Sequence, residues 1–455
     1  MKLKFTAICC FILSFALVLL SDGGVYPLSL SLAVLLMAVS VVCAGFRGGL
    51  HPGTTGLFVA ALFLWFALTG WIVIQATPLP ADGLGNPAWA VVREAGISVS
   101  PSIAVVPGDA VFAILPISLS FMTFLASLLL FRTDQQVQRA LQIWGTCGAA
   151  FAMFAILQAI FFPTALMFGA KQSYFGSLTA PFVNRNTAAT FYGLMLASLI
   201  VSYAMAAARN GPASQVQVWL GLPAKWVFAS MALIVAIALA LTQSRGGALA
   251  ATAGCGVLAV VLVLQAWCRA RRHRYGRDLT RWRAVLLVVA AVALVVVAGS
   301  FLFGRAAIRT ERQGLDDTRL CVARSVLPAI ADNWGAGTGP SSFRYYFPAY
   351  RSAECGLQGT WYRAHNFYVE TILALGSIAA LFAFVFAYGV IIMVLLTGLR
   401  RRRRKKPLIW GGIAALVIAT IHSFTDFSLQ IPGFSMQLAF LIAVSLIIST
   451  NNRLT

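Results

Sequence analysis

The chain has 455 residues, of which 60% are hydrophobic and only 10% are charged. Soluble domains have about 45–50% apolar and about 25% charged residues, so this composition excludes a soluble globular fold. The net charge of +21 is typical of nucleic-acid-binding surfaces on polar chains. In an apolar chain, its meaning depends on where the basic residues lie.

Apolar stretches of about 20 residues, the length of helix that crosses a bilayer, recur along the whole sequence. The first stretch follows two lysines, as a signal peptide does, but no small-residue cleavage site follows it, so we expect it to remain as a span. The predicted fold class is an all-α integral membrane protein. Its twelve predicted transmembrane helices lie at residues 5–20, 27–46, 56–76, 110–131, 140–162, 187–208, 226–243, 247–267, 284–303, 367–397, 408–425 and 431–449.

The basic residues are unevenly divided between the two sides of this topology. With both termini in the cytoplasm, the inner segments carry 22 of the 34 Lys and Arg residues and two of the 13 acidic residues. Because Lys and Arg are enriched in cytoplasmic loops, we expect this orientation. The dense runs at 269–283 and 400–406 are interpreted as topology anchors that contact anionic membrane lipids, and we expect no nucleic-acid partner.

The longest connections lie on the predicted outer side. The pattern divides the chain into spans one to nine at 1–303, a large outer loop at 304–366, and spans ten to twelve at 367–455. Loops of this length usually carry function. Apolar residues at spacings of three and four predict a helix within the loop, which ends at the glycine-rich turn 333–340. These apolar positions are Leu320, Ala323, Val326, Leu327 and Ile330.

Two further features of this loop allow alternative interpretations. Cys321 and Cys355 form a disulfide if the loop lies in an oxidising compartment, and otherwise stay free thiols. A dense aromatic cluster is either a belt at the membrane interface or a platform on which sugar rings stack. Its members are Phe343, Tyr345, Tyr346, Phe347, Tyr350, Trp361 and Tyr362.

Arginines stand at the outer ends of several predicted helices. Arg185 lies between Asn184 and Asn186 at a predicted helix start. The hydrogen-bond donors there could bind an anion, and the alternative interpretation is an arginine at the membrane interface whose side chain reaches toward water. Arg245 precedes two glycines at membrane depth, where an unpaired charge is costly, so an anionic partner is the favoured interpretation. Arg319 and Arg324 lie on the loop helix, either as anion ligands or as solvated surface charges.

His365 closes the large loop in the sequence Arg363-Ala-His365-Asn366 and is the only histidine of the outer loops. It is a candidate base, and Asn366 a candidate for orienting it or a substrate hydroxyl. His422 and Asp426 lie four residues apart near the outer end of the eleventh predicted span, as a structural hydrogen-bonded pair or as support for the site. The outer side shows no metal-ligand spacing and no nucleotide-binding fingerprint, so we expect no metal and no cofactor.

Four segments together resemble the O-antigen ligase and polymerase superfamily, and the likeness in layout covers nearly the whole chain. They are Phe182-Val-Asn-Arg-Asn-Thr-Ala-Ala, Thr242-Gln-Ser-Arg-Gly-Gly, Gly335-Ala-Gly-Thr-Gly-Pro and His365-Asn-Phe-Tyr-Val-Glu-Thr-Ile-Leu-Ala-Leu-Gly376. Ligases of this family carry a pattern of His, then Asn, Ser or Gln, then nine residues and Gly, with Gly, Thr or Tyr three residues later. His365, Asn366 and Gly376 fit this pattern, and Ala379 departs from it.

The resemblance implies a GT-C-like fold in the bacterial inner membrane, with the site facing the periplasm. It also implies transfer of a preassembled glycan from undecaprenyl pyrophosphate to a hydroxyl of lipid A–core, without metal and with inversion at the anomeric carbon. On this analogy His365 activates the acceptor, and Arg185, Arg245 and Arg319 grip the donor pyrophosphate, with Arg324 able to replace Arg319. Asn184, Asn186, Arg363 and Asn366 would support them.

Two other functions remain open at the level of sequence. A polymerase of the same superfamily joins repeat units of O-antigen or exopolysaccharide with the same donor type, and the histidine pattern favours the ligase. A polysaccharide flippase or secondary transporter also has about twelve spans. Transporters usually carry ionisable residues in the middle of the membrane, whereas this chain gathers its polar residues at the outer boundary.

Overall fold

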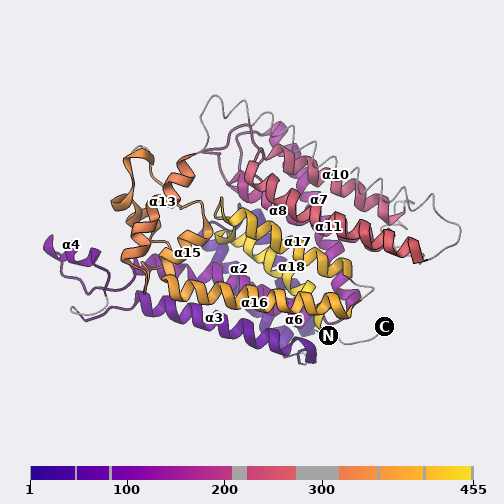
Figure 1. Ribbon diagram of the computed structural model, residues 1–455, viewed down its shortest axis with the longest axis horizontal. Helices are drawn as coiled ribbons and strands as arrows, with labels where there is room; N and C mark the ends of the chain where they lie inside the picture. The colour runs from indigo at the N-terminus through magenta and orange to yellow at the C-terminus, as the bar shows by residue number, and fades with distance from the viewer. Residues whose placement is uncertain are drawn as a thin grey trace.

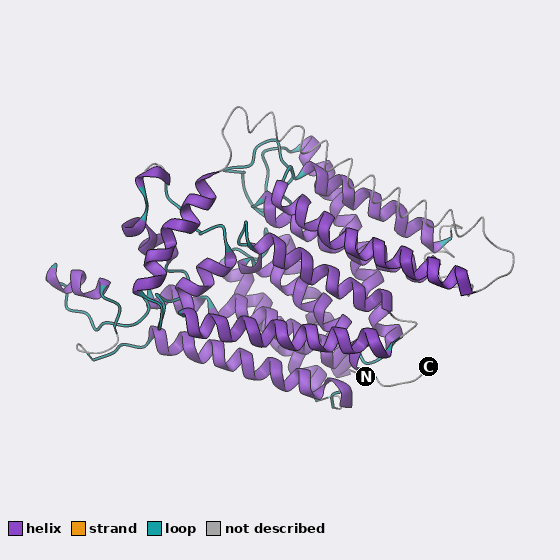
Figure 2. Ribbon diagram, in the orientation of Figure 1, coloured by secondary structure: helices purple, strands orange, loops and turns teal. Residues whose placement is uncertain are grey.

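The protein is almost entirely helical, as the computed structural model shows (Figure 2). The structure describes residues 2–46, 49–80, 85–207, 223–272, 317–355, 359–402 and 406–451. Eleven helices in these ranges are long and apolar enough to cross a membrane. The long helices are α1 (Lys2–Leu20), α2 (Pro27–Gly45), α3 (Thr55–Ala76), α6 (Ile114–Leu130), α7 (Asp134–Phe161), α8 (Arg185–Ala207), α10 (Ala224–Leu241), α11 (Arg245–Arg272), α16 (Ser377–Arg401), α17 (Lys406–Ser423) and α18 (Pro432–Thr450).

These helices match eleven of the twelve predicted spans, and the all-α membrane fold is confirmed. The remaining predicted span, 284–303, lies outside the described residues. One prediction is wrong in detail: residues 367–397 do not form one helix. They divide into the short helix α15 (Phe367–Leu375) and the long helix α16, with Gly376 between them.

α8 and α18 lie at the centre of the bundle. In the most apolar 18 residues of each helix, the buried share is 83% in α8 and 78% in α18, against 17% in α16. α8 packs against α7, α10, α11 and α17, whereas α3 and α16 run along one edge of the bundle (Figure 1). Small residues allow this approach, because a side chain at Gly247 or Gly254 would collide with α8 or α17.

α13 (Asp317–Asp332) and α4 (Ala88–Glu94) project from one end of the bundle, at the left of Figure 1. We call this the loop end. The opposite end is tied by an ion pair between Arg402 and Asp134, and Asn451 also donates to Asp134 at 3.1 Å. The loop end carries a folded extension, formed by α13 and the segments 333–355 and 359–365 that follow it.

Gly376 makes the sharp joint between α15 and α16. Its φ of +81° is a conformation that residues with side chains rarely adopt, and a Cβ atom there would collide with the carbonyl of Gly335. Gly337, at φ +73°, contacts the same joint from the glycine-rich turn after α13. The two glycines thus let two backbones approach each other at one point.

The last carbonyl groups of α15 are all satisfied at this joint, although a helix end leaves them without partners inside the helix. The amide of Thr338 donates to the Leu373 carbonyl, and the amide of Gly339 to the Ala374 carbonyl, each at 2.9 Å. Trp71 Nε1 of α3 donates to the Leu375 carbonyl at 2.8 Å. The joint therefore binds the extension to a membrane-spanning helix.

The extension has a small hydrophobic core of its own. α13 ends at Asp332, as the glycine-rich turn predicts, but its buried positions are Val322, Val326 and Ala329, whereas Leu327 is 55% exposed. Phe343 and Phe347 stack in this core with ring centroids 4.8 Å apart, on α14 (Phe343–Tyr346) and the 3₁₀ turn η2 (Phe347–Tyr350). Much of the predicted aromatic cluster is thus core, and only the rings of Tyr345 and Tyr362 are well exposed.

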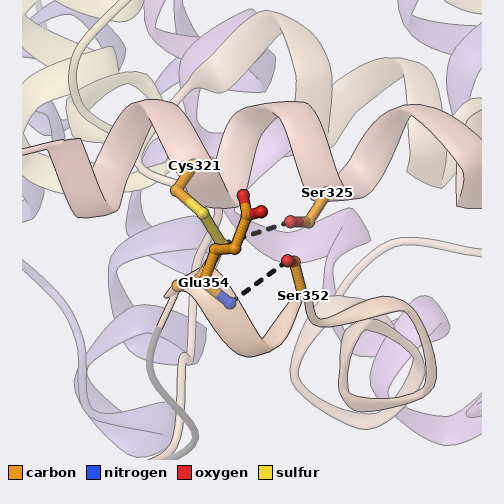
Figure 3. The surroundings of a disulfide bond; sticks show 5 residues. Cys321, Ser325, Ser352 and Glu354 are labelled. Carbon is orange, nitrogen blue, oxygen red and sulfur yellow. Dashed lines mark hydrogen bonds between the residues drawn. A yellow bond between two sulfur atoms is a disulfide. The ribbon is translucent and has the colours of Figure 1, made fainter.

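Cys321 of α13 and Cys355 of η3 (Ala353–Cys355) form a disulfide, with Cα atoms 5.5 Å apart (Figure 3). Ser325 lies one turn further along α13, with its Oγ 3.2 Å from the sulfur of Cys355. The amide of Glu354 donates to Ser352 at 3.3 Å and shapes the short turn. The bond closes 34 residues of chain, which in an entropic model stabilises the extension by about 3–4 kcal/mol.

Replacing Gly376 tests the joint. We expect Gly376→Ala to lower the thermal unfolding temperature of the purified protein by roughly 5 °C or more, because of backbone strain and the collision with Gly335. Gly389→Ala in α16 is the matched control, since a side chain there meets open space and alanine favours helix. Equal unfolding temperatures for the two variants would show that the joint does not require glycine.

Candidate active site

The loop end is organised around one buried carboxylate, Asp426, in the segment that joins α17 to α18. Its side chain is 1% exposed, and both of its oxygens are engaged. Ser428 Oγ, on the 3₁₀ turn η4 (Ser428–Gln430), donates to Oδ2 at 2.8 Å, and Asn186 Nδ2 donates to Oδ1 at 3.2 Å. His365 Nδ1 lies 3.4 Å from the same Oδ1. Asp426 therefore connects three parts of the chain.

Asp426 stays ionised in this setting. Burial raises the pKa of its carboxyl, but the adjacent Nδ1 of His365, the nearby charge of His422 and the hydroxyl of Ser428 together outweigh burial and lower the pKa to about 2. An ionised carboxylate can only accept hydrogen bonds, so the histidine nitrogen that faces it must carry a proton. We infer from the 3.4 Å contact that the proton of neutral His365 lies on Nδ1, which leaves Nε2 as the basic nitrogen.

His365 is held in an unusual backbone conformation, with φ at +51°. Left-handed backbone is uncommon for a residue with a side chain and is often found at functional sites. The neighbouring amide of Ala364 donates to Glu370 at 2.8 Å, which fixes the turn. The imidazole lies edge-on to Trp361 and Phe427, with centroids 5.7 and 5.0 Å away, and its side chain is 18% exposed. The ring is thus oriented and still reachable.

The two neighbours predicted to support His365 have structural partners. Asn366 begins α15, and its side-chain oxygen accepts from the amides of Tyr368 and Val369, each at 3.1 Å, as a helix cap. Arg363 donates to the buried Glu370 at 2.9 Å, so its charge is paired within the protein. Both residues therefore contribute to the turn that presents His365.

The starts of α8 and α11 meet beside this histidine. Asn184 caps α8, since its side chain accepts from the amide of Asn186 at 2.8 Å. Ser244 caps α11 by accepting from Gly247 at 3.2 Å, and it donates to Asn186 at 2.8 Å. The chain from Ser244 through Asn186 to Asp426 is buried throughout. Helix starts carry positive potential, and two of them converge here.

Arg185 and Arg245 are the first residues of these two helices. Arg185 Nη1 lies 3.4 Å from Ser177 Oγ, and its guanidinium lies over the ring of Tyr174, 5.4 Å from the centroid. Arg245 is exposed. The hydrogen bond between Asn186 and Ser244 brings the two helix starts together, so both predicted arginines flank the network of Asp426 and His365.

Lys171 is a residue at this site that the sequence analysis missed. It is 8% exposed, and its ammonium donates to the Ser177 carbonyl at 2.9 Å. No carboxylate lies within ion-pair distance of it among the described residues. Burial lowers the pKa of the Lys171 ammonium, and a buried cation without an acidic partner favours an incoming anion. Ser177 thus lies between two cationic side chains, Lys171 and Arg185.

The two arginines predicted on the loop helix belong to α13. Arg324 is exposed on α13. Arg319 lies on the first turn of α13, and its side chain is outside the described residues. A spacing of four residues predicts that His422 and Asp426 share one helix face, but Asp426 lies beyond the end of α17; His422 Nδ1 is 4.0 Å from Asp426 Oδ2. Within the described ranges no cluster of three or more His, Cys, Asp or Glu has the geometry of a metal site.

A comparison with known families now bears on this geometry. Residues 230–384, about a third of the chain, match the family model described as O-antigen ligase. This segment is similar to the O-antigen ligase superfamily. The matched segment contains Arg245, the folded extension and His365, and the match does not separate ligases from polymerases. Among curated proteins, none matches the chain. Together with the eleven apolar helices, this similarity supports a multi-pass membrane enzyme of the glycosyltransferase kind.

The charge of Asp426 has a measurable effect on stability. A lowered carboxyl pKa stabilises the folded state above the ordinary pKa of 3.8, and this contribution is lost as the pH falls toward 2. A shift of this size corresponds to about 2 kcal/mol at neutral pH. We expect Asp426→Asn to lower the unfolding temperature at pH 7 and to flatten its decline between pH 5 and pH 3, as measured by differential scanning fluorimetry.

Asp109→Asn provides the control for this comparison. Asp109 also pairs with an arginine, Arg344, but its side chain is 39% exposed. Exposed pairs contribute little, so this variant should follow the wild-type curve. An Asp426→Asn variant with the wild-type unfolding temperature and pH dependence would contradict an ionised, stabilising Asp426.

Proposed function

We propose that the protein transfers a preassembled glycan from undecaprenyl pyrophosphate to a hydroxyl of lipid A–core, with His365 as the general base. The observation that carries the proposal is the 3.4 Å contact between His365 Nδ1 and the buried, ionised Asp426. This contact orients the imidazole and leaves Nε2 free to accept a proton. Paired histidine and carboxylate groups act in this way in other transferases and hydrolases.

The proposed donor is a diphosphate, which requires positive charge. Arg185, Arg245 and the starts of α8 and α11 supply charge beside His365, and the buried Lys171 adds a cation that has no acidic partner among the residues that the structure describes. Arginine suits phosphate because its planar donors bind two oxygens at once. These groups would stabilise the negative charge that develops on the leaving diphosphate.

The proposed step is a single displacement. The acceptor hydroxyl oxygen attacks the anomeric carbon, the bond from that carbon to the phosphate oxygen breaks, and undecaprenyl pyrophosphate leaves with the electron pair. His365 Nε2 takes the hydroxyl proton. A single displacement inverts the anomeric configuration. The step needs no metal or cofactor in this proposal, because the sugar diphosphate bond is already activated.

The proposed location is the bacterial inner membrane, with both termini cytoplasmic and the loop end in the periplasm. The disulfide between Cys321 and Cys355 supports this orientation, because disulfides persist in oxidising compartments and are rare in the cytosol. The proposed domain organisation keeps spans one to nine at 1–303, the periplasmic extension at 304–366 and the last spans at 367–455.

A reconstituted reaction tests this function. Purified full-length protein receives the lipid-linked glycan, lipid A–core and a metal chelator, and glycosylated lipid A–core is measured by gel electrophoresis. We expect transfer by the wild-type protein and a loss of roughly 10²–10⁴-fold in His365→Ala, which lacks the base. His51→Ala is the control, because His51 caps a short turn at the opposite end of the bundle.

Three results would contradict the proposal. Full transfer by His365→Ala would exclude the base, and a requirement for a proton gradient would indicate transport. Elongation of one lipid-linked glycan by another, with no transfer to lipid A–core, would identify a polymerase.

A further inference from the structure

A polar cavity of about 170 Å³ lies at the loop end, apart from the network of Asp426. Three segments form its walls, one around Asn86, one at Ile103 and one at Asp332–Gly337. A hydrogen bond of 2.9 Å from Asn86 Nδ2 to Asn333 Oδ1 joins the first and the last of these, and a second runs from the Val105 amide to the Thr338 carbonyl at 2.9 Å. The cavity is therefore held by backbone and amide contacts.

Trp334 contributes an aromatic surface to this cavity. The residue is 60% exposed although it follows directly on the end of α13. Its backbone is fixed, because its carbonyl accepts from the amide of Ser377 at 2.7 Å. An exposed indole on a fixed backbone at the wall of a polar cavity is available for stacking on a flat apolar surface.

Asp332 and Asn86 contribute hydrogen-bonding groups. Tyr350 donates to Asp332 Oδ2 at 2.8 Å, which orients the carboxylate and leaves acceptor positions on it. Asn86 Nδ2 has two hydrogens, of which Asn333 takes one. The wall includes a carboxylate and, in the part of the chain that the structure describes, no lysine or arginine. This charge disfavours phosphate groups and lipid headgroups.

These groups match the chemistry of a sugar. A pyranose ring has a face of C–H groups that packs on an indole, and hydroxyls at its rim that bind carboxylate and amide groups. A cavity that combines an aromatic wall with a few fixed polar groups is typical of small-ligand sites. An apolar lipid tail would leave the carboxylate without a partner.

The cavity and the candidate base lie at opposite ends of the short helix α15. Gly335, in the cavity wall, contacts Gly376 at the end of α15, and His365 lies just before the start of the same helix. Nine helical residues span about 13 Å, so a glycan of a few rings would reach from one place to the other.

We propose that the cavity formed by Asn86, Asp332 and Trp334 is a subsite for a sugar ring of the glycan chain, remote from the bond that reacts. The inference rests on the proposed glycosyl transfer. The ring belongs either to the donor glycan or to the acceptor core, because the two offer the same hydroxyls and ring faces. Binding there orients a long chain relative to His365.

Binding of phosphate-free oligosaccharides to the purified full-length protein tests the subsite. The two probes are the glycan released from the lipid-linked donor and the oligosaccharide released from lipid A–core, each titrated by calorimetry. We expect one probe to bind, which identifies the source of the ring. Trp334→Ala and Asp332→Asn should each weaken that binding about tenfold or more.

Control variants distinguish sugar binding at this subsite from the proposed transfer by His365. Trp334→Phe keeps an aromatic face and should restore binding, and Trp226→Ala removes an exposed tryptophan of α10 and should leave binding unchanged. His365→Ala should bind the oligosaccharide normally and yet fail in transfer, so the two proposals fail separately. Absence of binding by both probes, or unchanged affinity in Trp334→Ala and Asp332→Asn, would overturn the subsite.

Discussion

The loop end of the protein depends on the satisfaction of one buried carboxylate. An ionised group out of water is costly unless other groups bind it, and Asp426 is bound from α8, from η4 and from the turn before α15. These contacts place His365 beside two helix starts that belong to distant parts of the chain. The position of the candidate base, the orientation of its ring and the nitrogen that carries its proton all follow from this one charge.

A second constraint acts at the joint between α15 and α16, where a helix ends inside the structure and its carbonyl groups need donors. The turn after α13 and Trp71 of α3 supply them, and Gly376 allows the close approach. The same joint fixes the short helix that begins next to His365. The folded extension, the proposed sugar subsite and the candidate base are thus connected through one rigid helix of nine residues.

Much of the fold could be predicted from the sequence, because long apolar stretches leave a chain few alternatives in a membrane, and local signals marked the end of α13 and the starts of α8 and α11. The rest depends on tertiary contacts. The break at Gly376 falls within a continuous apolar run, so hydropathy gives no sign of it. Phe343 and Phe347 are core residues because the extension folds on itself. Lys171 lies in an ordinary loop by sequence, and only burial distinguishes it. The sequence does not show which segments cover Lys171, so its burial could not be predicted.

Most of the net positive charge supports the proposed orientation in the membrane. The proposed chemistry depends instead on a few charges that are buried or lie at helix starts. We infer that Asp426 fixes the proton of neutral His365 on Nδ1. Nitrogen-15 NMR of histidine-labelled protein measures this directly, since the chain has four histidines and His365→Gln identifies the signal. We expect neutral His365 to carry its proton on Nδ1 and to lose this preference in Asp426→Asn. A proton on Nε2 in the wild-type protein, or the same signal in both proteins, would contradict the claim.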